Sequence, residues 1–468
     1  MRPAERQRLI CSESLIISPT PIPRSAVPGI GWPAIPPKVG AAMLAMQFQL
    51  ARTQWWPREE LERQQLRQLD AVLKHAVETV PFYARRLIAA GYSDRAQLDW
   101  DSFTRLPLTH RADLQTSLDL MQSSRPPADH GRRLEGYTSG STGTPLRFFG
   151  TEVTHFFWGA LNLRDHRWHD RDFARKHAVI RAGIDDGPVS GWGASSEVAY
   201  HTGPGVGLNI RADIDAQLRW LQREAPAYLL THPSNLRALA LRSIDGGLAI
   251  PGLVEVRTFG ELVEPELRDL CRRAWNVPLT DMYSTEEAGY IALQCPEHDH
   301  YHVQAENLVV EVLDEAGCPS APGDIGRVVV TMLHNFTMPL IRYEIGDYAE
   351  VGAPCPCGRG LPVLARILGR RRNMVKLPDG TRHWPYFSLS KWGFALPVRQ
   401  LQMVQHTLDH IEVKLVCTRP LQRQDIDILT DALRDGFGHP FRITVTPVSG
   451  IDRSANFKYE DFVCLVPD

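Results

Sequence analysis

The sequence has no run of about 18 apolar residues, so it predicts no membrane-spanning helix. It also lacks a strong excess of either charge, because 52 basic and 54 acidic side chains give a formal net charge of -2. This near-neutral balance argues against a nucleic-acid partner and against an anionic membrane as partner. Cysteine is scarce, at eight in 468 residues, and no secretory pattern accompanies it. These features argue against a disulfide framework, and we expect a protein of the reducing cytoplasm.

The length of the chain predicts two or more domains, because one hydrophobic core rarely extends over so many residues. Residues 1–42 are rich in proline, and we expect them to form a disordered leader. Between Pro57 and Pro81 apolar side chains recur at helical spacing. Farther along, short apolar runs alternate with helical patterns, which predicts an α/β layered domain over residues 43–368.

A second, smaller domain is predicted for residues 369–468, after a charged connector that contains glycine. Within it, residues 411–417 alternate as a half-buried strand does, residues 425–437 have helical spacing, and residues 441–445 alternate again. This pattern predicts a strand–helix–strand unit of the α+β kind. In the large domain, the apolar runs 308–313 and 327–332 flank a turn-rich stretch and are expected to pair as a hairpin.

Residues 136–145, Gly-Tyr-Thr-Ser-Gly-Ser-Thr-Gly-Thr-Pro, have the composition of a phosphate-binding loop. Its three glycines let backbone N–H groups approach an anion closely, and its hydroxyl side chains add donors without bulk. It is not a Walker loop, because the lysine of that motif is absent. A strand-like run at residues 146–149 follows directly, which argues against a flexible linker.

This loop resembles the nucleotide-phosphate loop of the acyl-adenylate-forming superfamily, and three further segments follow in that family's order. Residues 259–261 resemble the strand end that packs against adenine, and residues 281–286 resemble the segment with the adenine tyrosine and the Mg²⁺ glutamate. Residues 341–347 resemble the segment whose aspartate binds the ribose. The resemblance implies ATP binding by Thr138, Ser139, Gly140, Ser141, Thr142, Gly143, Thr144, Gly260, Glu261, Tyr283, Ser284, Thr285, Asp347 and Arg370.

The chemistry of these residue types agrees with the roles that the resemblance implies. Asp347 can accept hydrogen bonds from two vicinal ribose hydroxyls, and Glu286 offers a hard oxygen ligand for Mg²⁺. Taken alone, either acid reads more simply as a surface or turn residue. Thr142 of the loop and Glu286 are expected to act in catalysis, together with Lys458 near the C-terminus.

Within the superfamily, the sequence is most similar to phenylacetate–CoA ligases and their capsule-biosynthesis and deazaflavin-cofactor relatives. The marks are residues 73–83, 338–343 and 355–359, and the likeness covers roughly residues 45–468. It implies an adenylate-forming, acyl-CoA synthetase-like large domain and a small mobile C-terminal domain. The implied reaction activates an aryl or acyl carboxylic acid with ATP and passes it to a thiol of CoA or of a carrier protein. A homodimer is possible in such a family.

Two alternatives stay open at the sequence level. One is an adenylyltransferase, or a ligase of the same fold that uses an amine or a carrier protein as acceptor. The other is a degenerate protein that binds the nucleotide without turnover, because Phe457 stands where a glycine is usual and Arg372 where a hinge aspartate is usual. Lys458 is the catalytic lysine if the segment that follows it is aligned without a gap. A shift of two residues would place Asn456 there instead.

Cys295, His302, Cys355 and Cys357 form a candidate zinc set. Three thiolates and one imidazole make a closed tetrahedral site, which would be structural because no ligand position remains open. Some relatives carry this set, and their histidine aligns best with His302. His298, at Cys-x₂-His spacing, is the geometric alternative. The simpler reading is a set of reduced cysteines beside a polar, histidine-rich loop.

Overall fold

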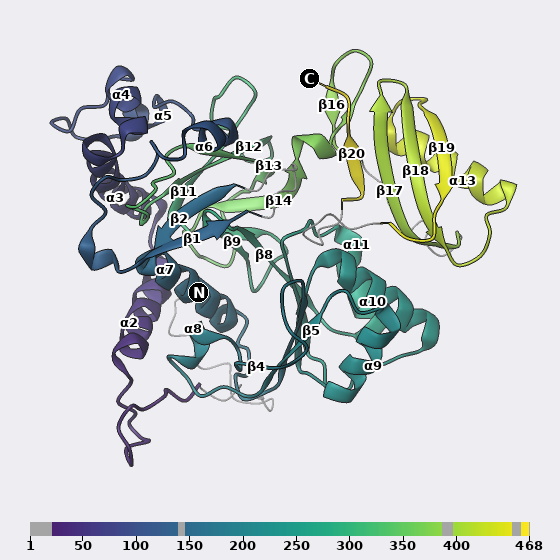
Figure 1. Ribbon diagram of the computed structural model, residues 1–468, viewed down its shortest axis with the longest axis horizontal. Coiled ribbons are helices and arrows are strands. Elements are labelled where there is room, and N and C mark those ends of the chain that lie inside the picture. The colour runs from purple at the N-terminus through teal and green to yellow at the C-terminus, as the bar shows by residue number, and fades with distance from the viewer. Residues whose placement is uncertain (1–20, 139–145, 386–395, 452–459, 468) are drawn as a thin grey trace.

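The computed structural model describes residues 21–138, 146–385, 396–451 and 460–467. Figure 1 shows a large domain with a central sheet and, beside it, a small domain formed by the C-terminal quarter of the chain. Within these described ranges, no helix is long and apolar enough to cross a membrane. The expected α/β architecture with a separate α+β domain is confirmed.

A sheet of 12 strands forms the centre of the large domain, in the order β11-β12-β13-β14-β10-β9-β8-β7-β6-β3-β5-β4. Strands β5, β3, β6, β7 and β8 pair in parallel, and the other pairs are antiparallel. The bounds are β3 His177–Arg181, β4 Gly187–Val189, β5 Gly205–Asn209, β6 Tyr228–Thr231, β7 Glu255–Phe259, β8 Leu279–Thr285, β9 Gly289–Gln294, β10 Tyr301–Val303, β11 Leu308–Leu313, β12 Ile325–Met332, β13 Tyr343–Val351 and β14 Val363–Arg370.

Helices of the large domain pack on this sheet in groups. Helices α9, α10 and α11 alternate with the parallel strands, and their apolar faces build a core with β3, β6, β7 and β8. Helices α3 to α6 belong to a second core around β11, β12 and β13. The bounds are α2 Lys38–Thr53, α3 Arg58–Thr79, α4 Pro81–Ala89, α5 Trp100–Thr104, α6 Arg111–Ser117, η1 Ala128–His130, α7 Glu152–Trp168, α8 Ala194–Glu197, α9 Ile214–Glu224, α10 Pro233–Gly246 and α11 Pro265–Trp275.

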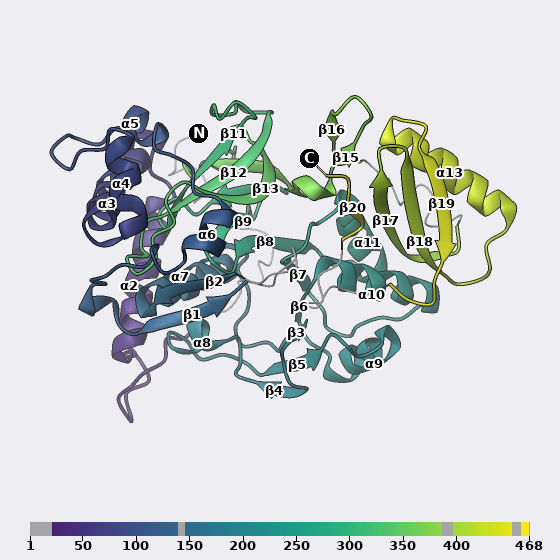
Figure 2. The ribbon, with the colours of Figure 1, turned by 45° about the horizontal axis from the view of Figure 1, so that its top comes forward.

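The small domain contains a four-stranded sheet in the order β19-β18-β17-β20, and helix α13 packs on it. Figure 2 shows it facing the part of the large domain that carries α10 and α11. Leu429, Leu433 and Phe437 of α13 are fully buried against the sheet, as their helical spacing predicts. The bounds are η2 Arg371–Asn373, β15 Val375–Lys376, β16 Arg382–His383, β17 Val398–Thr407, β18 His410–Cys417, α13 Arg423–Phe437, β19 Arg442–Pro447 and β20 Phe462–Cys464.

Several predicted elements are confirmed. The helical spacing between the two prolines forms α3, which begins at Arg58 and ends at Thr79. The expected hairpin is the antiparallel pair β11–β12, and the predicted strand–helix–strand unit is β18, α13 and β19. Residue 369, the expected domain boundary, is the second-last residue of β14.

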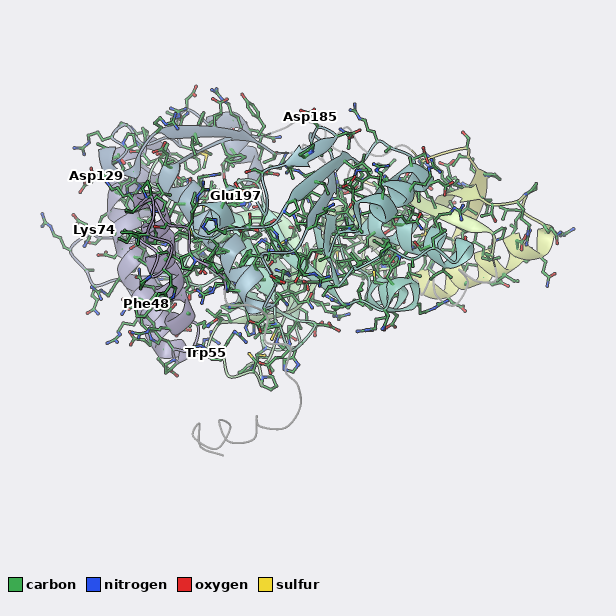
Figure 3. The ribbon with its side chains drawn as sticks, turned by 90° about the horizontal axis from the view of Figure 1, so that it is seen from below. Phe48, Trp55, Lys74, Asp129, Asp185 and Glu197 are labelled. Carbon is green, nitrogen blue, oxygen red and sulfur yellow. The ribbon has the colours of Figure 1, made fainter. Side chains whose placement is uncertain are left out.

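The N-terminal segment differs in part from the expected leader. Helix α2 begins at Lys38, and Gly40 packs so tightly that a Cβ there would lie 2.1 Å from the carbonyl oxygen of Val198. Before the helix, the N–H of Arg24 donates to the carbonyl of Ala199 at 2.9 Å. Figure 3 shows Phe48 of α2 and the nearby Trp55 on the same side of the molecule, at the rim of the large domain.

A buried charge network joins α7 to the central strands. Asp165 of α7 accepts hydrogen bonds from Arg171 and from Arg257 of β7, each at 2.6 Å, and Arg171 also pairs with Glu255 at 2.6 Å. Burial raises the pKa of Asp165, but the two guanidinium groups outweigh it and lower the pKa to about 2. The network therefore fixes β7 with all its charges paired, just before the strand end at residues 259–261.

Candidate active site

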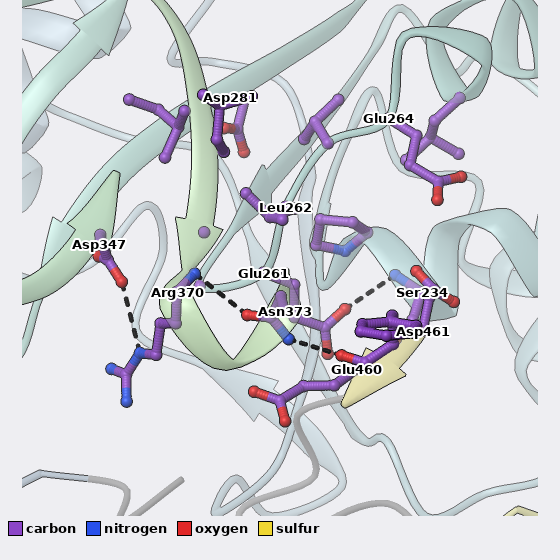
Figure 4. A pocket seen from close by; sticks show the side chains of 18 of the residues that line it. Ser234, Glu261, Leu262, Glu264, Asp281, Asp347, Arg370, Asn373, Glu460 and Asp461 are labelled. Atoms are coloured by element: carbon purple, nitrogen blue, oxygen red, sulfur yellow. Dashed lines mark hydrogen bonds and ion pairs between the residues drawn. The ribbon is translucent and has the colours of Figure 1, made fainter. Parts of the chain in front are cut away.

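A cavity of about 740 Å³ lies between the two domains. The carboxyl ends of β7 and β8 open into it, as expected for ligand sites of sheets with parallel strands. From the large domain, the first turn of α10, Asp347 in the middle of β13 and the end of β14 also line it. Met403 of β17 and Asp461 before β20 line it from the small domain. Figure 4 shows this cavity with its polar side chains drawn.

Tyr283, Asp347 and Arg370 meet on one side of the cavity. The hydroxyl of Tyr283 donates to Asp347 Oδ2 at 2.9 Å, and Arg370 Nε lies 3.3 Å from Asp347 Oδ1 (Figure 4). Burial and the neighbouring Asp347 raise the pKa of Tyr283, so the phenol stays neutral and remains a donor. The sequence-predicted adenine and ribose residues thus come together from β8, β13 and the end of β14.

Gly260 and Glu261 lie on the adjacent strand end. Gly260 has φ of 77°, a left-handed conformation that glycine adopts without strain, and it turns the chain sharply after β7. Glu261 Oε2 accepts a hydrogen bond from the backbone N–H of Ser234 at 2.9 Å (Figure 4). Since Ser234 lies in the first turn of α10, Glu261 ties the cavity wall to a helix N-terminus, where a carboxylate is favoured.

The end of β8 presents acidic and hydroxyl groups to the same cavity. Ser284, Thr285 and Glu286 all line it, and Glu286 is exposed, so its carboxylate is available to a hard cation such as Mg²⁺. The next residue, Glu287, is only half-exposed, and burial raises its pKa. The two adjacent glutamates therefore lie in different environments, since Glu286 is exposed to solvent and Glu287 is partly buried.

Arg111, the first residue of α6, also lines the cavity, and its charge lowers the raised pKa of Glu287. Sequence reasoning missed this residue. A single arginine at the start of a short helix has no spacing or composition that separates it from a surface charge. Only the packing of α6 against β13 brings it near the nucleotide residues.

Several predicted site residues lie outside the described part of the chain. These are Ser139, Gly140, Ser141, Thr142, Gly143 and Thr144 of the phosphate loop, and Asn456, Phe457 and Lys458 of the lysine segment. The two anchors of the loop are described. Strands β1 (Arg133–Tyr137) and β2 (Arg147–Thr151) pair antiparallel, and the backbone N–H of Thr138 donates to the carbonyl of Leu146 at 2.8 Å. Thr138 itself is buried and lines the cavity.

A second candidate centre lies at the β9–β10 turn. The ligand atoms of Cys295, His302, Cys355 and Cys357 all lie within 4.8 Å of one another. The Sγ atoms of Cys295 and Cys355 are 3.8 Å apart, and Cys357 Sγ lies 3.5 Å from His302 Nε2. Zinc–sulfur bonds of about 2.3 Å in a tetrahedron place two sulfurs roughly 3.8 Å apart, so the donor set fits zinc.

The protonation of this centre differs among its four groups, because burial raises the pKa of the Cys295 thiol and raises that of Cys355 to about 12, whereas the other two groups already suit a metal. Burial lowers the pKa of His302 to about 3, which keeps the imidazole neutral as a ligand must be. Although burial raises the pKa of Cys357, hydrogen bonds from Arg359 outweigh it and lower the pKa of the thiol. His298, the geometric alternative, is not in the group and instead stacks on His300.

Comparisons with known proteins point to one family. Residues 389–463 match the CapK C-terminal domain family. The phenylacetate–coenzyme A ligase of Thermus thermophilus is 24% identical over 444 residues, which cover 86% of this chain and 96% of that protein. The chain is similar to phenylacetate–CoA ligases over most of its length. The likeness thus extends over both domains of this phenylacetate–CoA ligase-like chain.

Solved structures of similar fold agree with this assignment. A crystal structure of 2-hydroxyisobutyryl-CoA ligase in the postadenylation state has a TM-score of 0.71 at 19% identity, covering 88% of this chain and 91% of that one. The same ligase in the thioesterification state has a TM-score of 0.58, with similar coverage of 89% and 92%.

Proposed function

We propose that the chain is an AMP-forming ligase that activates a carboxylic acid with ATP and passes the acyl group to the thiol of CoA. The observation that carries this proposal is the group formed by Tyr283, Asp347 and Arg370 at the strand ends of an adenylate-forming fold. Similarity to a phenylacetate–coenzyme A ligase over nearly the whole chain supports the substrate classes.

In the first step, a carboxylate oxygen of the acid bonds to the α-phosphorus of ATP, and pyrophosphate leaves. Asp347 would hold the ribose and Tyr283 the adenine, so that the α-phosphate is fixed for in-line attack. Glu286 would hold a Mg²⁺ ion, which when bound neutralises polyphosphate charge. The amides and hydroxyls of the phosphate loop and Lys458 would stabilise the charge that develops in the transition state.

In the second step, the thiol gives its proton to solvent, its sulfur attacks the acyl carbonyl carbon, and AMP leaves with the bonding electrons of the acyl–phosphate bond. The proposed zinc takes no part in either step. Cys295, His302, Cys355 and Cys357 would hold it as a closed structural ion that joins β10 to the loop before β14.

The direct test is a pyrophosphate-release screen of the purified protein over aryl, fatty and amino acids, with and without CoA. We expect pyrophosphate release with at least one acid, and CoA-dependent release of AMP. Release of pyrophosphate with no thiol-dependent AMP would point instead to a carrier protein or an amine as acceptor. ATP binding with no turnover for any acid would refute the ligase and favour a degenerate binding protein, a reading that Arg372 and Phe457 suggest.

A further inference from the structure

One arginine beside the candidate metal centre is buried without a close counter-charge. The side chain of Arg359, two residues after Cys357, is only 8% exposed. Its Nη1 atom is buried and has no hydrogen-bond partner in the part of the chain that the structure describes. The carboxylate of Glu297 lies 4.0 Å from Nη1, and that side chain is itself 60% exposed. Because so exposed a carboxylate at this distance compensates a cation weakly, the buried charge requires another source of compensation.

The guanidinium group of Arg359 is held in place by the end of α2 and the end of α7. Its Cζ lies 4.7 Å from the ring centre of Trp55 and 4.9 Å from that of Trp168. Its Nε donates to Gln54 Oε1 at 3.3 Å, and the same oxygen accepts a hydrogen bond from Trp168 Nε1 at 2.7 Å. Aromatic faces attract a guanidinium group but do not neutralise it. The positive charge is therefore fixed at this position and remains to be balanced.

The same surroundings place the guanidinium group next to the ligands of the candidate metal centre. The ring of Trp168 contacts that of His302 edge to face, with ring centres 5.8 Å apart. Glu297 belongs to the turn that follows Cys295, and its backbone N–H donates to Cys295 Sγ at 3.4 Å. Arg359 thus adjoins the β9–β10 segment of the centre through space and the Cys357 segment through the chain.

A second arginine on the same ring shows what a compensated charge looks like here. Arg164 Cζ lies 5.3 Å from the ring centre of Trp168. Its Nη2, however, pairs at 2.6 Å with Glu306 Oε1, and the Glu306 side chain is only 14% exposed. The protein therefore provides an internal carboxylate for Arg164, whereas the described residues provide none for Arg359.

A loaded metal centre would supply the missing charge. Three thiolates and a divalent ion leave one net negative charge, since the imidazole ligand is neutral. A guanidinium group carries one positive charge at every accessible pH. Arg359 and the loaded centre are therefore neutral together, and burial of either one without the other costs free energy.

We propose that Arg359 is a positioning residue of the metal centre, whose charge balances the anionic complex of a divalent ion with three thiolates and so raises the affinity for that ion. The proposal rests on the zinc site proposed above and is independent of turnover of any acid. A centre with two thiolates and two imidazoles would be neutral and would leave the arginine uncompensated, so the charge balance specifies the ligand set as well as the metal class.

The test is a chelator competition that measures the zinc affinity of the purified protein. Arg359→Met removes the charge but keeps an unbranched side chain against the two indole rings, whereas Arg359→Lys keeps the charge. We expect Arg359→Met to bind zinc about 10- to 100-fold more weakly than the wild type, the usual effect of removing an outer partner of a metal ligand. Arg359→Lys should retain most of the affinity. Arg132→Met is the control and should bind as the wild type does, since Arg132 is 85% exposed and pairs with Glu152.

Thermal unfolding with and without zinc separates the effect of charge from that of packing. In excess chelator, Arg359→Met and the wild type should unfold at similar temperatures, whereas added zinc should raise the midpoint of the wild type more. Equal zinc affinities of Arg359→Met and the wild type would overturn the proposal. An equal loss of stability with and without zinc, or an Arg359→Lys as weak as Arg359→Met, would reduce the residue to packing and overturn it as well.

Should Arg359→Met fail to fold, Arg359→Gln makes the same comparison with a neutral polar side chain. The wild type also separates this proposal from the metal site on which it rests. If the wild type takes up no zinc, the metal site and the role of Arg359 fail together. If the wild type takes up zinc and loss of the charge leaves the affinity unchanged, the metal site stands and only the role of Arg359 is refuted.

Discussion

At the scale of single residues, the side chains of the candidate site form hydrogen bonds and ion pairs with one another. Asp347 contacts both Tyr283 and Arg370, so its two carboxylate oxygens are oriented before any nucleotide arrives. Such preorganisation lowers the cost of ordering the site on binding. Among the described residues, Asp347 is therefore the position at which a single substitution should change the affinity for the nucleotide most clearly.

We expect Asp347→Ala to weaken ATP binding by about 1–3 kcal/mol, because hydrogen bonds to a charged group are lost. Isothermal titration of the variant with Mg·ATP measures this. Asp185→Ala is the control, since Asp185 is exposed and does not line the cavity. Unchanged affinity in Asp347→Ala would contradict the ribose assignment.

The buried charge network offers a prediction about stability. Asp165→Asn leaves the guanidinium groups of Arg171 and Arg257 facing each other without their shared carboxylate. We expect the free energy of unfolding to fall by about 3–5 kcal/mol, the scale for removing one partner of a buried ion pair. Urea unfolding at neutral pH measures it, with Asp185→Asn, an exposed acid, as control. A loss below about 0.5 kcal/mol would show that the network does not stabilise the fold.

The direction of the pKa shift of Asp165 determines how the stabilisation by this network depends on pH. The pKa of Asp165 is lowered to about 2 in the folded protein, against about 3.9 in an unfolded chain. The stabilisation is therefore fully present above about pH 4 and is lost as the pH falls from there toward about 2. Asp165→Asn should flatten the acid limb of the stability curve over that range.

At the scale of elements, the proposed zinc site joins parts of the chain that are far apart in sequence. Cys295 directly follows β9 and His302 belongs to β10, whereas Cys355 and Cys357 lie in the loop before β14. Strand β10 pairs with both β9 and β14, and this register brings the four ligands together. A metal here would fasten three strands at one point.

We expect the protein, purified without added metal, to contain about one Zn²⁺ per chain. Cys355→Ser should reduce that content to near zero and lower the midpoint of thermal unfolding, because metal binding and folding are coupled. The matched control is Cys318→Ser, which alters an exposed free cysteine outside the group. Metal analysis by mass spectrometry decides the matter. Negligible zinc in the wild type, with stability indifferent to a chelator, would rule the site out.

Periodicity in the sequence predicted the elements whose packing is regular. Helix α3, the β11–β12 hairpin and the β18–α13–β19 unit each bury one face, so apolar residues recur with the period of the element. The sequence did not reveal that α2 begins at Lys38 or that Gly40 packs on Val198, because an alanine-rich helix with small residues has a weak pattern. The many prolines before Lys38 favoured the prediction of a disordered leader instead.

The site was predictable where its residues lie in contiguous motifs at strand ends. Tyr283, Glu286 and Asp347 belong to such segments, and the fold brings them to one cavity. Arg111 could not be predicted, because its place in the cavity depends on the packing of α6 against β13, two elements far apart in sequence that meet only in space. The charge and spacing of residues along the sequence do not predict such contacts.

At the scale of the whole molecule, the expected nucleotide-binding residues and the expected catalytic lysine belong to different domains. Tyr283 and Asp347 belong to the large domain, whereas Lys458 belongs to the sequence of the small domain, between β19 and β20. Binding of ATP and activation of the acid should therefore be separable. The large domain would bind the nucleotide in any arrangement, and adenylation would require the small domain to bring its cation to the α-phosphate.

We predict that Lys458→Ala lowers the rate of pyrophosphate release on the order of 10²–10³-fold, the usual effect of removing one preorganised charge from a transition state. Affinity for Mg·ATP and thermal stability should stay close to those of the wild type, because the nucleotide contacts of Tyr283 and Asp347 do not involve this lysine. Lys376→Ala is the control for charge in the small domain, since its Nζ donates to the backbone carbonyl of Pro467 at 2.5 Å rather than facing the cavity. Stopped-flow pyrophosphate assays and calorimetry on the same samples separate the two properties. Turnover of Lys458→Ala at the wild-type rate would refute the assignment of the lysine. Equal losses of ATP affinity and turnover would show that nucleotide binding and adenylation are not separated between the two domains.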